Sequence, residues 1–304
     1  MHYRWDAHGK CVPPHSEGGI AVSTFCCYNR KVAVDPVIDV AAGKHFAIWA
    51  RKKETQQDNE SMTEDPYAGF AARYDWMKAE DPARRAFFEQ IFAKHGVTRV
   101  LDCACGTGRD LLMFHAMGLE VSGSDLSDAM LARARENLGD VDIPLLKADY
   151  RQLPQHYNAN FDAVVCLSNS INEPLEDAET LRALRSMAAV LRSGGILVFD
   201  QGQTDASMRD PPRFAPVVNN RDFTRFFVID YAGEIQTVHI FDFLHTEEGS
   251  GFYQASVQIR IRLLDSWRQV LRAAGFSRFE FFGDWHGTPY SKETSRRLIA
   301  VAVK

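Results

Sequence analysis

The sequence predicts a doubly wound α/β domain that carries an inserted antiparallel β-sheet. Short apolar runs alternate with helix-periodic segments between residues 82 and 200, a pattern typical of a parallel sheet with helices on both faces. Beyond residue 200 the pattern changes to strands in which apolar and polar residues alternate, which indicates antiparallel pairing. A turn of small residues, "DCACGTG" at residues 102–108, joins the first predicted strand to a helix.

Each predicted element follows from its residue pattern and its stop signals. Gly96, Gly118 and Gly139 follow three of the helical patterns, as is common at helix C-termini. Ser127 and Asp128 are the candidate N-caps of the third helix. The predicted helices span residues 81–96, 108–118, 127–139, 178–195 and 264–275. The predicted parallel strands span residues 99–104, 120–125, 143–149, 161–168 and 196–200, the antiparallel meander spans 222–231, 234–246 and 251–263, and two final strands span 279–285 and 295–304.

Length, charge and composition restrict the classes of function. The chain has 304 residues, of which 45% are hydrophobic, and a net charge of −5. This acidic balance provides no basic field for nucleic acid, and no apolar run reaches the length of about 18 residues needed to span a membrane. Six cysteines in so long a chain do not form a disulfide scaffold, and the first residues lack an apolar signal-peptide core. We therefore expect a cytoplasmic location and neither a nucleic-acid nor a membrane partner.

Residues 1–61 differ in character from the rest of the chain. They contain three of the six cysteines and end in the polar run "RKKETQQDNES". Their one strand-like pattern, at residues 31–40, is interrupted by Pro36. We expect a poorly ordered, dispensable extension followed by the main domain at residues 62–304, with residues 205–263 as an inserted lid.

The small residues of the 102–108 turn predict a ligand that lies against the backbone. Glycines permit this close approach, and the helix that begins near Gly108 directs free N–H groups toward it. A dinucleotide or a nucleoside with an amino-acid tail would fit. In the dinucleotide fingerprint G-x-G-x-x-G, counted from Gly106, the third glycine would fall on Leu111, which argues against a dinucleotide.

The rhythm acidic-x-small-x-Gly-x-Gly, formed by Asp102, Ala104, Gly106 and Gly108, resembles the first motif of the class I S-adenosylmethionine-dependent methyltransferases. The stretches "RVLDCACGTGRD", "FDAVVCLSNSINEP" and "LRSGGILVFD" resemble the branch of glycine N-methyltransferases and related small-molecule N-methyltransferases. This resemblance covers about residues 67–304. It implies a Rossmann-like, seven-stranded sheet whose last strand is antiparallel. It also implies S-adenosylmethionine as cofactor and S-adenosylhomocysteine as product.

The same resemblance implies which residues bind the cofactor. Asp125, at the end of the second strand, would bind the ribose hydroxyls, and Asp149 would bracket the adenine with Tyr150 over the ring. Asp102 would orient the loop N–H groups or the ammonium of the cofactor. The expected cofactor residues are Tyr67, Tyr74, Asp102, Ala104, Gly106, Gly108, Asp125, Leu126, Asp149, Tyr150, Leu167 and Asn169.

The acceptor site is less defined by the sequence. The resemblance assigns Asn169 and Ser170 to the substrate. Glycine N-methyltransferases hold the substrate carboxylate with an arginine just after the fifth strand, whereas here "FDQGQTD" has none before Arg209, which disfavours glycine itself. Arg209 is the candidate arginine for binding the substrate. The histidines expected to position or deprotonate the acceptor are His239, His245 and His286. We expect no metal ion, because Cys103 and Cys105 lack further Cys or His residues at ligand spacing.

The sequence therefore predicts transfer of a methyl group from S-adenosylmethionine to a small molecule, at the nitrogen of an amine, amino acid or amino sugar. One alternative is a small-molecule O-methyltransferase of the same fold, which would need a base beside the acceptor. Further alternatives are a nicotinamide-dependent oxidoreductase and a non-catalytic ligand-binding protein. The meander is expected to form a lid or a surface for homo-oligomer contact.

Overall fold

The computed structural model describes residues 4–5, 11–12, 65–77, 81–158, 160–246 and 249–304. The chain divides into two compact units, Met1–Asn59 and Glu60–Lys304. In the first unit, strands β1 (Arg4–Trp5) and β2 (Cys11–Val12) pair antiparallel. The strand-like pattern at residues 31–40, and most of the predicted extension, lie outside the described residues.

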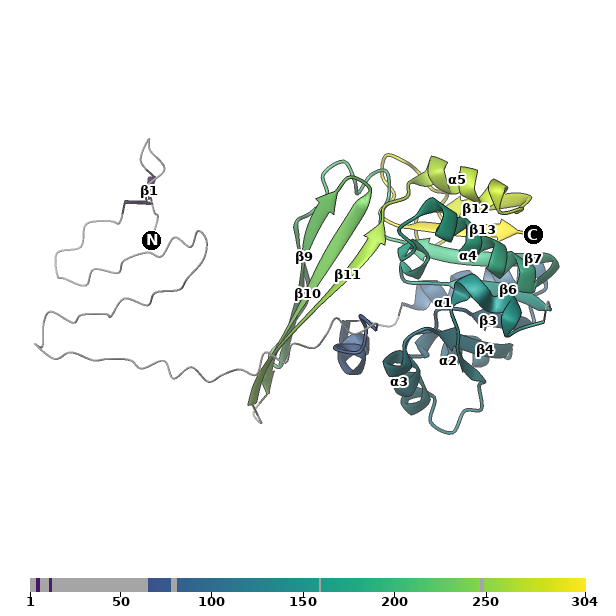
Figure 1. The fold of residues 1–304 in the computed structure, drawn as a ribbon, viewed down its shortest axis with the longest axis horizontal. Coiled ribbons are helices and arrows are strands. Elements are labelled where there is room, and N and C mark those ends of the chain that lie inside the picture. Colours follow the sequence, from purple (N-terminus) through teal and green to yellow (C-terminus); the bar gives the residue numbers. More distant parts are fainter. Residues whose placement is uncertain (1–3, 6–10, 13–64, 78–80, 159, 247–248) are drawn as a thin grey trace, which may run out of the picture. The chain divides into compact units, whose positions relative to one another are not determined.

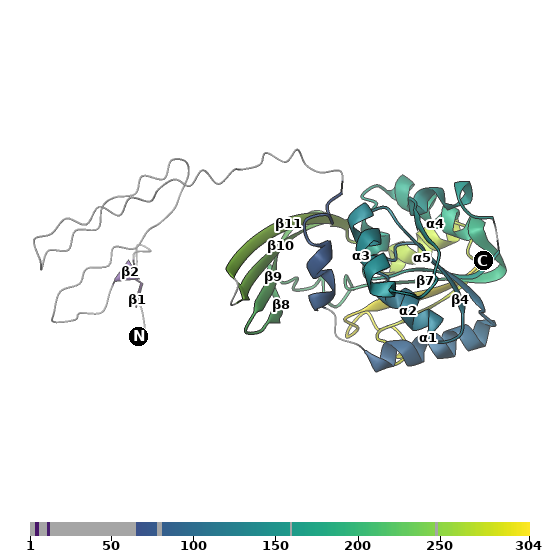
Figure 2. The same ribbon diagram turned by 90° about the horizontal axis from the view of Figure 1, so that it is seen from below.

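The second unit contains a seven-stranded sheet with the order β12-β13-β7-β6-β3-β4-β5 (Figures 1 and 2). The last strand, β13, runs antiparallel to both β7 and β12, and the pairs among the other five strands are parallel. The predicted seven-stranded sheet with an antiparallel last strand is therefore confirmed. Its strands are β3 (Arg99–Asp102), β4 (Glu120–Asp125), β5 (Leu145–Lys147), β6 (Phe161–Cys166), β7 (Leu191–Gln201), β12 (Arg278–Phe282) and β13 (Leu298–Val303).

Helices cover both faces of this sheet, because its central strands are apolar on both sides. Alternate residues of β7 enter two different clusters: Leu197 and Phe199 pack with α4 and α5, whereas Ile196 and Val198 pack with α1, α2 and α3. Continuous apolar strands of this kind are typical of buried parallel sheets. The helices are α1 (Pro82–His95), α2 (Arg109–His115), α3 (Asp128–Leu138), α4 (Asp177–Val190) and α5 (Leu264–Ala273).

Local signals set most helix ends. The Asp81 side chain accepts a hydrogen bond from the Ala83 N–H at the start of α1, and Ser127 caps α3 by accepting from the Met130 N–H. By contrast, α4 ends at Val190, before the double glycine at which the sequence pattern predicts its end. The next residue, Leu191, is fully buried and pairs with Phe161 of β6. Burial in the sheet thus overrides the helical pattern at this point.

The insertion forms a separate antiparallel sheet, which we call the inserted sheet. It comprises β8 (Phe214–Asn219), β9 (Phe223–Ala232), β10 (Ile235–Thr246) and β11 (Gly249–Arg260), in the order β11-β10-β9-β8. The meander prediction found the last three strands but missed β8. Pro216 and a register shift interrupt that edge strand, which hides its alternation.

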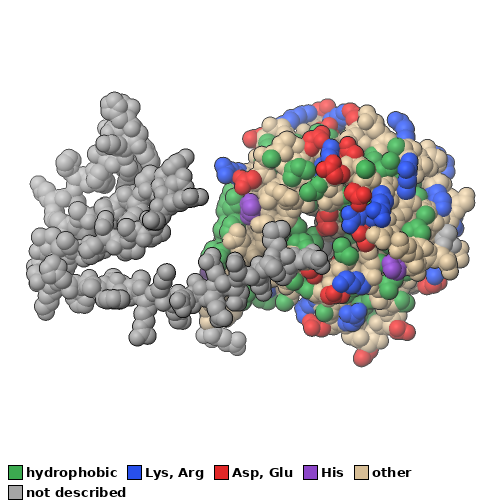
Figure 3. Space-filling view, in the orientation of Figure 1, with side chains coloured by type: hydrophobic (Ala, Val, Ile, Leu, Met, Phe, Trp, Pro, Cys, Tyr) green, Lys and Arg blue, Asp and Glu red, His purple; other side chains and the backbone are tan. Residues whose placement is uncertain are grey.

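The inserted sheet stands to one side of the α/β body, and the 3-10 helix η1 (Ala71–Met77) lies between them in both ribbon views (Figures 1 and 2). On the inner face of the inserted sheet, Ile240 packs with Phe70, just before η1, and with Met130 of α3. The outer face carries stacked phenylalanines, including Phe226 and Phe241. Figure 3 shows hydrophobic side chains gathered over this sheet, whereas acidic and basic side chains are interspersed over the body. Within the described residues, every helix is too short or too polar to cross a membrane.

A buried ion cluster connects the inserted sheet to η1. Asp242 of β10 accepts two hydrogen bonds of 2.6 Å from Arg225 of β9 and one of 3.0 Å from Nε of Arg73 of η1. The side chains of Arg225 and Asp242 are 0% and 1% exposed. The Arg73 guanidinium also lies 3.7 Å from the centroid of the Tyr253 ring of β11. These charges have lost their hydration and depend on one another.

Asp242→Asn should therefore destabilise the protein strongly. The substitution keeps the shape of the side chain but leaves two arginines without their counter-charge, at a cost of about 3–5 kcal/mol. Urea unfolding measures the change. The control is Glu280→Gln, which breaks an ion pair with Lys94 whose side chains are about half exposed and should cost below about 1 kcal/mol. Equal small effects of the two substitutions would contradict this role of the cluster.

Candidate active site

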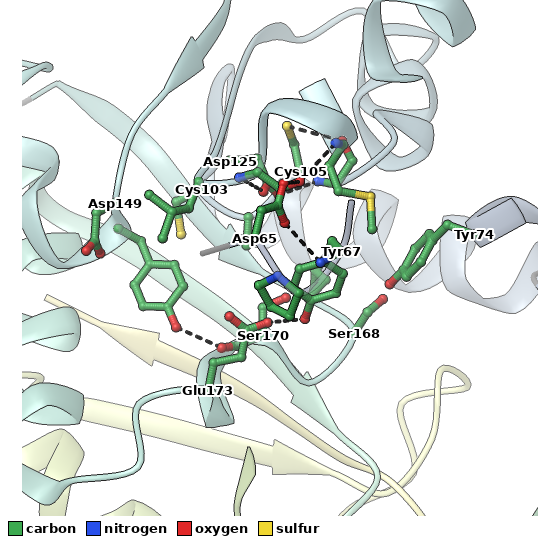
Figure 4. Close-up of a pocket in the computed structure, with 18 of the residues that line it drawn as sticks. Asp65, Tyr67, Tyr74, Cys103, Cys105, Asp125, Asp149, Ser168, Ser170 and Glu173 are labelled. Carbon is green, nitrogen blue, oxygen red and sulfur yellow. Dashed lines mark hydrogen bonds between the residues drawn. The ribbon is translucent and has the colours of Figure 1, made fainter. Parts of the chain in front are cut away.

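A cavity of about 250 Å³ lies at the carboxyl ends of β3, β4 and β6 (Figure 4). Ligands bind at this edge in open α/β sheets. Nine of the residues expected at the cofactor line it, and Ser170, expected at the substrate, lines it too. These nine are Tyr67, Tyr74, Ala104, Gly106, Asp125, Leu126, Asp149, Tyr150 and Leu167.

Asp125 organises the small-residue loop. Its carboxylate accepts the Gly106 N–H at 2.8 Å and the Ser127 N–H at 2.9 Å. Burial raises the pKa of Asp125, although these N–H groups act in the opposite direction. Gly106 has a φ of 53°, a conformation that favours glycine. The loop therefore presents backbone and a carboxylate, with little side-chain bulk, to the cavity.

Asp102 and Gly108 lie outside the lining of this cavity. They act on the loop through a hydrogen bond and through close packing. Asp102 is 2% exposed and accepts the Ala104 N–H at 3.2 Å. Burial and the nearby charge of Asp110 raise the pKa of Asp102 well above its usual range. Gly108 has a φ of 78°, and a Cβ there would lie 3.2 Å from the Cβ of Ala134 of α3. Close packing of α3 accounts for this glycine.

Asp149 and Tyr150 line the opposite side of the cavity. Arg151 donates to both carboxylate oxygens of Asp149, from Nε at 2.9 Å and from Nη2 at 2.6 Å to Oδ2 and from Nε at 3.0 Å to Oδ1. Burial raises the pKa of Asp149, but these hydrogen bonds outweigh burial and leave that pKa below its usual value. The Tyr150 hydroxyl donates to the Ser170 carbonyl at 3.0 Å, which fixes its ring beside the cavity.

The segment at residues 65–77, which precedes α1 in the chain, forms one side of the cavity. Asp65 accepts a 2.6 Å hydrogen bond from the Ser127 hydroxyl. Asp75 accepts 2.6 Å and 2.9 Å hydrogen bonds from Thr107 and Asn137. These contacts hold Tyr67 and Tyr74 at the cavity. The sequence pattern predicts Ser127 only as an N-cap and does not point to Asp65, although Asp65 lies only two residues before Tyr67.

A second cavity, of about 950 Å³, adjoins the first. Both are lined by Tyr67, Tyr74, Asp110, Ser168 and Glu173. The inner face of the inserted sheet forms an apolar wall, and polar residues at the strand ends and arginines of α1 and α2 complete the lining. The apolar wall consists of Phe227, Ile229, Val238, Ile240, Val257 and Ile259, with Gln236 of β10 on the same sheet, and the other side includes Arg84, Arg109, Asn169, Asp200, Gln203, Trp285 and Arg297.

An arginine does reach the end of the fifth parallel strand, from another part of the chain. Arg297, just before β13, donates to Oδ2 of Asp200 in β7. The other oxygen of Asp200 accepts the Ser168 N–H at 2.8 Å. Ser168 and Asn169 have φ values of 61° and 71°, and such strained backbone persists only where the surroundings enforce it. Asn169 lines the second cavity and accepts the Gly202 N–H at 2.7 Å.

Glu173 lies where the two cavities meet, a position that the sequence pattern does not predict. Its Oε1 accepts a short hydrogen bond from the Tyr67 hydroxyl (Figure 4). Burial raises the pKa of Glu173 to about 7, although the bond from Tyr67 lowers it. Burial and the charge of Glu173 raise the pKa of Tyr67 well above its usual value, so the phenol remains a donor. The signal was present as an acidic residue in "SNSINEP", four positions after Asn169.

The three candidate histidines and Arg209 lie elsewhere. In the part of the chain that the structure describes, no histidine lines either cavity. Side chains alternate along β10, so His239 and His245 lie on the opposite face from Val238, and His239 contacts Ser256 at 2.8 Å. The backbone of His286 donates to Asp284, and Arg209 donates to the Lys292 carbonyl at 3.4 Å. The described residues contain no cluster of three potential metal ligands.

Comparisons with known proteins agree with this fold. Residues 100–195 match the family described as "methyltransferase domain". One relative, the glycine/sarcosine/dimethylglycine N-methyltransferase of Actinopolyspora halophila, is 28% identical over 264 residues, which are 82% of this chain and 44% of the relative. The chain covers 58% of another, a glycine/sarcosine N-methyltransferase of Aphanothece halophytica. It thus spans about half the length of these two relatives.

Solved structures share the fold over most of the chain. An S-adenosylmethionine-dependent methyltransferase of Clostridium acetobutylicum has a TM-score of 0.69 at 16% identity and covers 78% of this chain and 98% of its own. A sugar N-methyltransferase of a Streptoalloteichus species has a TM-score of 0.57 at 25% identity and covers 91% of this chain and 99% of its own. The fold is therefore that of the class I S-adenosylmethionine-dependent methyltransferases.

The raised pKa of Glu173 predicts a pH-dependent stability. A glutamate in the unfolded chain has a pKa of about 4.3, whereas Glu173 in the folded protein has a pKa of about 7. Its stabilising contribution is therefore complete below about pH 4 and is lost as the pH rises to 7. Glu173→Gln removes this dependence, so the stability of the variant relative to wild type should increase by on the order of 3 kcal/mol between pH 4.5 and 8.

Urea unfolding at several pH values, without ligand, measures this difference. Glu176→Gln is the control, because it removes one carboxylate from an exposed position three residues away. Parallel pH profiles for wild type and Glu173→Gln would show that Glu173 does not titrate in this way.

Proposed function

We propose that the protein transfers the methyl group of S-adenosylmethionine to the nitrogen of a small amine. One observation carries this proposal: a cavity built on the small-residue loop and Asp125 opens directly into a larger cavity. The first has the features of a site for a nucleoside with an amino-acid tail. The second has room for an acceptor beside it.

The residues of the first cavity fit S-adenosylmethionine. The carboxylate of Asp125 suits two ribose hydroxyls, and Tyr150 offers an aromatic face for the adenine. Asp149, at the same side, suits the polar edge of the base. The backbone of Ala104 and Gly106 lies against the cavity, where this loop of small residues would accommodate the amino-acid tail. The cofactor, when bound, supplies an activated methyl group on a positively charged sulfur.

The second cavity favours an acceptor larger than glycine. Its volume of about 950 Å³ is near the upper end of ordinary ligand sites, and one wall is apolar. An amine with an apolar face, such as an amino sugar or a larger amino acid, would contact both walls. The similarity to a sugar N-methyltransferase over 91% of this chain supports this choice. Arg297 could still bind a carboxylate if the acceptor has one.

The protein's part in the reaction is positioning. Tyr67 and Tyr74 line both cavities, so they border the path between donor and acceptor. The inserted sheet and the segment at residues 65–77 enclose this path and limit the access of water. Alignment of a nucleophile with a preformed electrophile in a closed site lowers the entropic part of the barrier.

A screen of acceptors tests the proposed function. The full chain is incubated with S-adenosylmethionine and with glycine, sarcosine, amino sugars and larger amino acids, and release of S-adenosylhomocysteine is measured. We expect release with one or more amines, and more with a larger amine than with glycine. Failure of all these nitrogen acceptors would contradict the proposal.

Asp125→Asn should weaken the binding of S-adenosylhomocysteine by about tenfold or more. A charged hydrogen bond contributes about 1.5–3 kcal/mol, and about 1.4 kcal/mol corresponds to tenfold in affinity. Isothermal titration calorimetry measures the dissociation constant. The matched control is Asp128→Asn, an exposed carboxylate at the start of α3 that pairs with Lys147. Unchanged affinity in the Asp125 variant would remove this residue from the cofactor site.

A further inference from the structure

Glu173 occupies a position that the binding of S-adenosylmethionine does not by itself explain. It follows the 3-10 helix η3 (Ser170–Asn172), which begins after the left-handed Asn169. This turn brings Glu173 back to the cavities, where it lines both of them together with Tyr67. Figure 4 shows the two side chains pointing toward each other below the small-residue loop. Glu173 is thus located where donor and acceptor must meet.

The other carboxylates near this junction are already engaged. Asp125 accepts two loop N–H groups, Asp149 is held by Arg151, and Asp200 is held by Arg297 and the Ser168 N–H. Among the described residues, the donor to the Glu173 side chain is the uncharged phenol of Tyr67. Glu173 is therefore a carboxylate of the junction that no arginine or lysine neutralises by a direct ion pair in the described structure.

Several charged groups act on Glu173 and set its protonation. Burial favours its neutral form most, and Asp125 and Asp149 also favour it, whereas the hydrogen bond from Tyr67 and the charge of Arg151 favour the ionised form. Asp65, Asp110 and Tyr74 also line the cavities around it. The balance places its pKa at about 7, where a side chain both binds and releases a proton near neutral pH.

We propose that the Glu173 carboxylate binds the ammonium form of the acceptor and removes its proton before methyl transfer. This inference rests on the proposed function. Most aliphatic amines are protonated near neutral pH and have no lone pair for attack, so a proton must leave first. The described residues place no histidine at the cavities to accept it.

The step balances as follows. The carboxylate takes one proton from the ammonium, which gives a carboxylic acid and a neutral amine. The nitrogen lone pair then forms the N–CH₃ bond as the S–CH₃ bond breaks, and that electron pair stays on sulfur to give the neutral thioether. The methylated product is an ammonium ion, and Glu173 returns its proton to solvent after product release.

Sinefungin tests this proposal without a known acceptor. This analogue of S-adenosylmethionine carries an amino group in place of the sulfonium methyl, so its ammonium extends toward the acceptor side. Wild-type protein should bind sinefungin about tenfold more tightly than S-adenosylhomocysteine at pH 8, as expected for a charged hydrogen bond. This preference should decrease as the pH falls to 5.5, because Glu173 becomes protonated while the amine stays charged.

Glu173→Gln should abolish the preference for sinefungin and its pH dependence. Its affinity for S-adenosylhomocysteine should stay within about twofold of wild type, which also shows that the variant folds. Glu173→Asp should restore part of the preference, and Glu176→Gln, at an exposed position, should retain all of it.

The outcomes separate this inference from the proposed function. Failure of wild-type protein to bind any of these nucleosides would overturn the proposed function and this inference with it. Normal binding of S-adenosylhomocysteine with an equal sinefungin preference in wild type and Glu173→Gln would overturn this inference alone. An equal loss of affinity for sinefungin and S-adenosylmethionine would also overturn it, since Glu173 would then neutralise the sulfonium rather than serve the acceptor.

Discussion

The buried contact of Asp242 with Arg73 and Arg225 sets the relation between the inserted sheet and the rest of the site. Arg73 belongs to η1, and Asp75 in the same 3-10 helix is fixed to Thr107 in the small-residue loop. One short segment is thus bonded to the inserted sheet on one side and to the loop on the other. Because unpaired buried charges are costly, this arrangement favours a single distance between the inserted sheet and the small-residue loop. The second cavity is the space that this spacing leaves.

The small-residue loop depends on a second constraint, the close packing beneath it. Leu111 is fully buried, and a Cβ on Gly123 of β4 would lie 2.6 Å from its Cδ1. The leucine thus fills space that the absence of a side chain at Gly123 provides. Some of the small residues around the loop therefore serve packing, as at Gly108 and Gly123, whereas Gly106 and Ala104 face the cavity. The chemistry of the cavity and the packing of the core share one short stretch of chain.

Much of the fold and about half of the site follow from local sequence. Apolar runs predict the strands, and residues at strand ends, such as Asp125 and Asp149, reach the cavity because parallel strands end at one edge. Glu173, Asp65 and Arg297 reach the site through turns and antiparallel strands whose path no local pattern specifies. His239 and His245 occur in a correctly predicted strand, but the choice of inner face depends on how the sheet packs. The sequence predicts that side chains alternate between the two faces of the strand, but not which face lines the cavity.

We propose that the two adjoining cavities bring S-adenosylmethionine and an amine together. The most direct measurement uses S-adenosylmethionine with a ¹³C-labelled methyl group, the full chain and the amine panel, followed by NMR of the product. In wild-type protein the label should move to nitrogen and show an N-methyl chemical shift. A label that stays on the donor with every acceptor, or that moves only to oxygen, would contradict it.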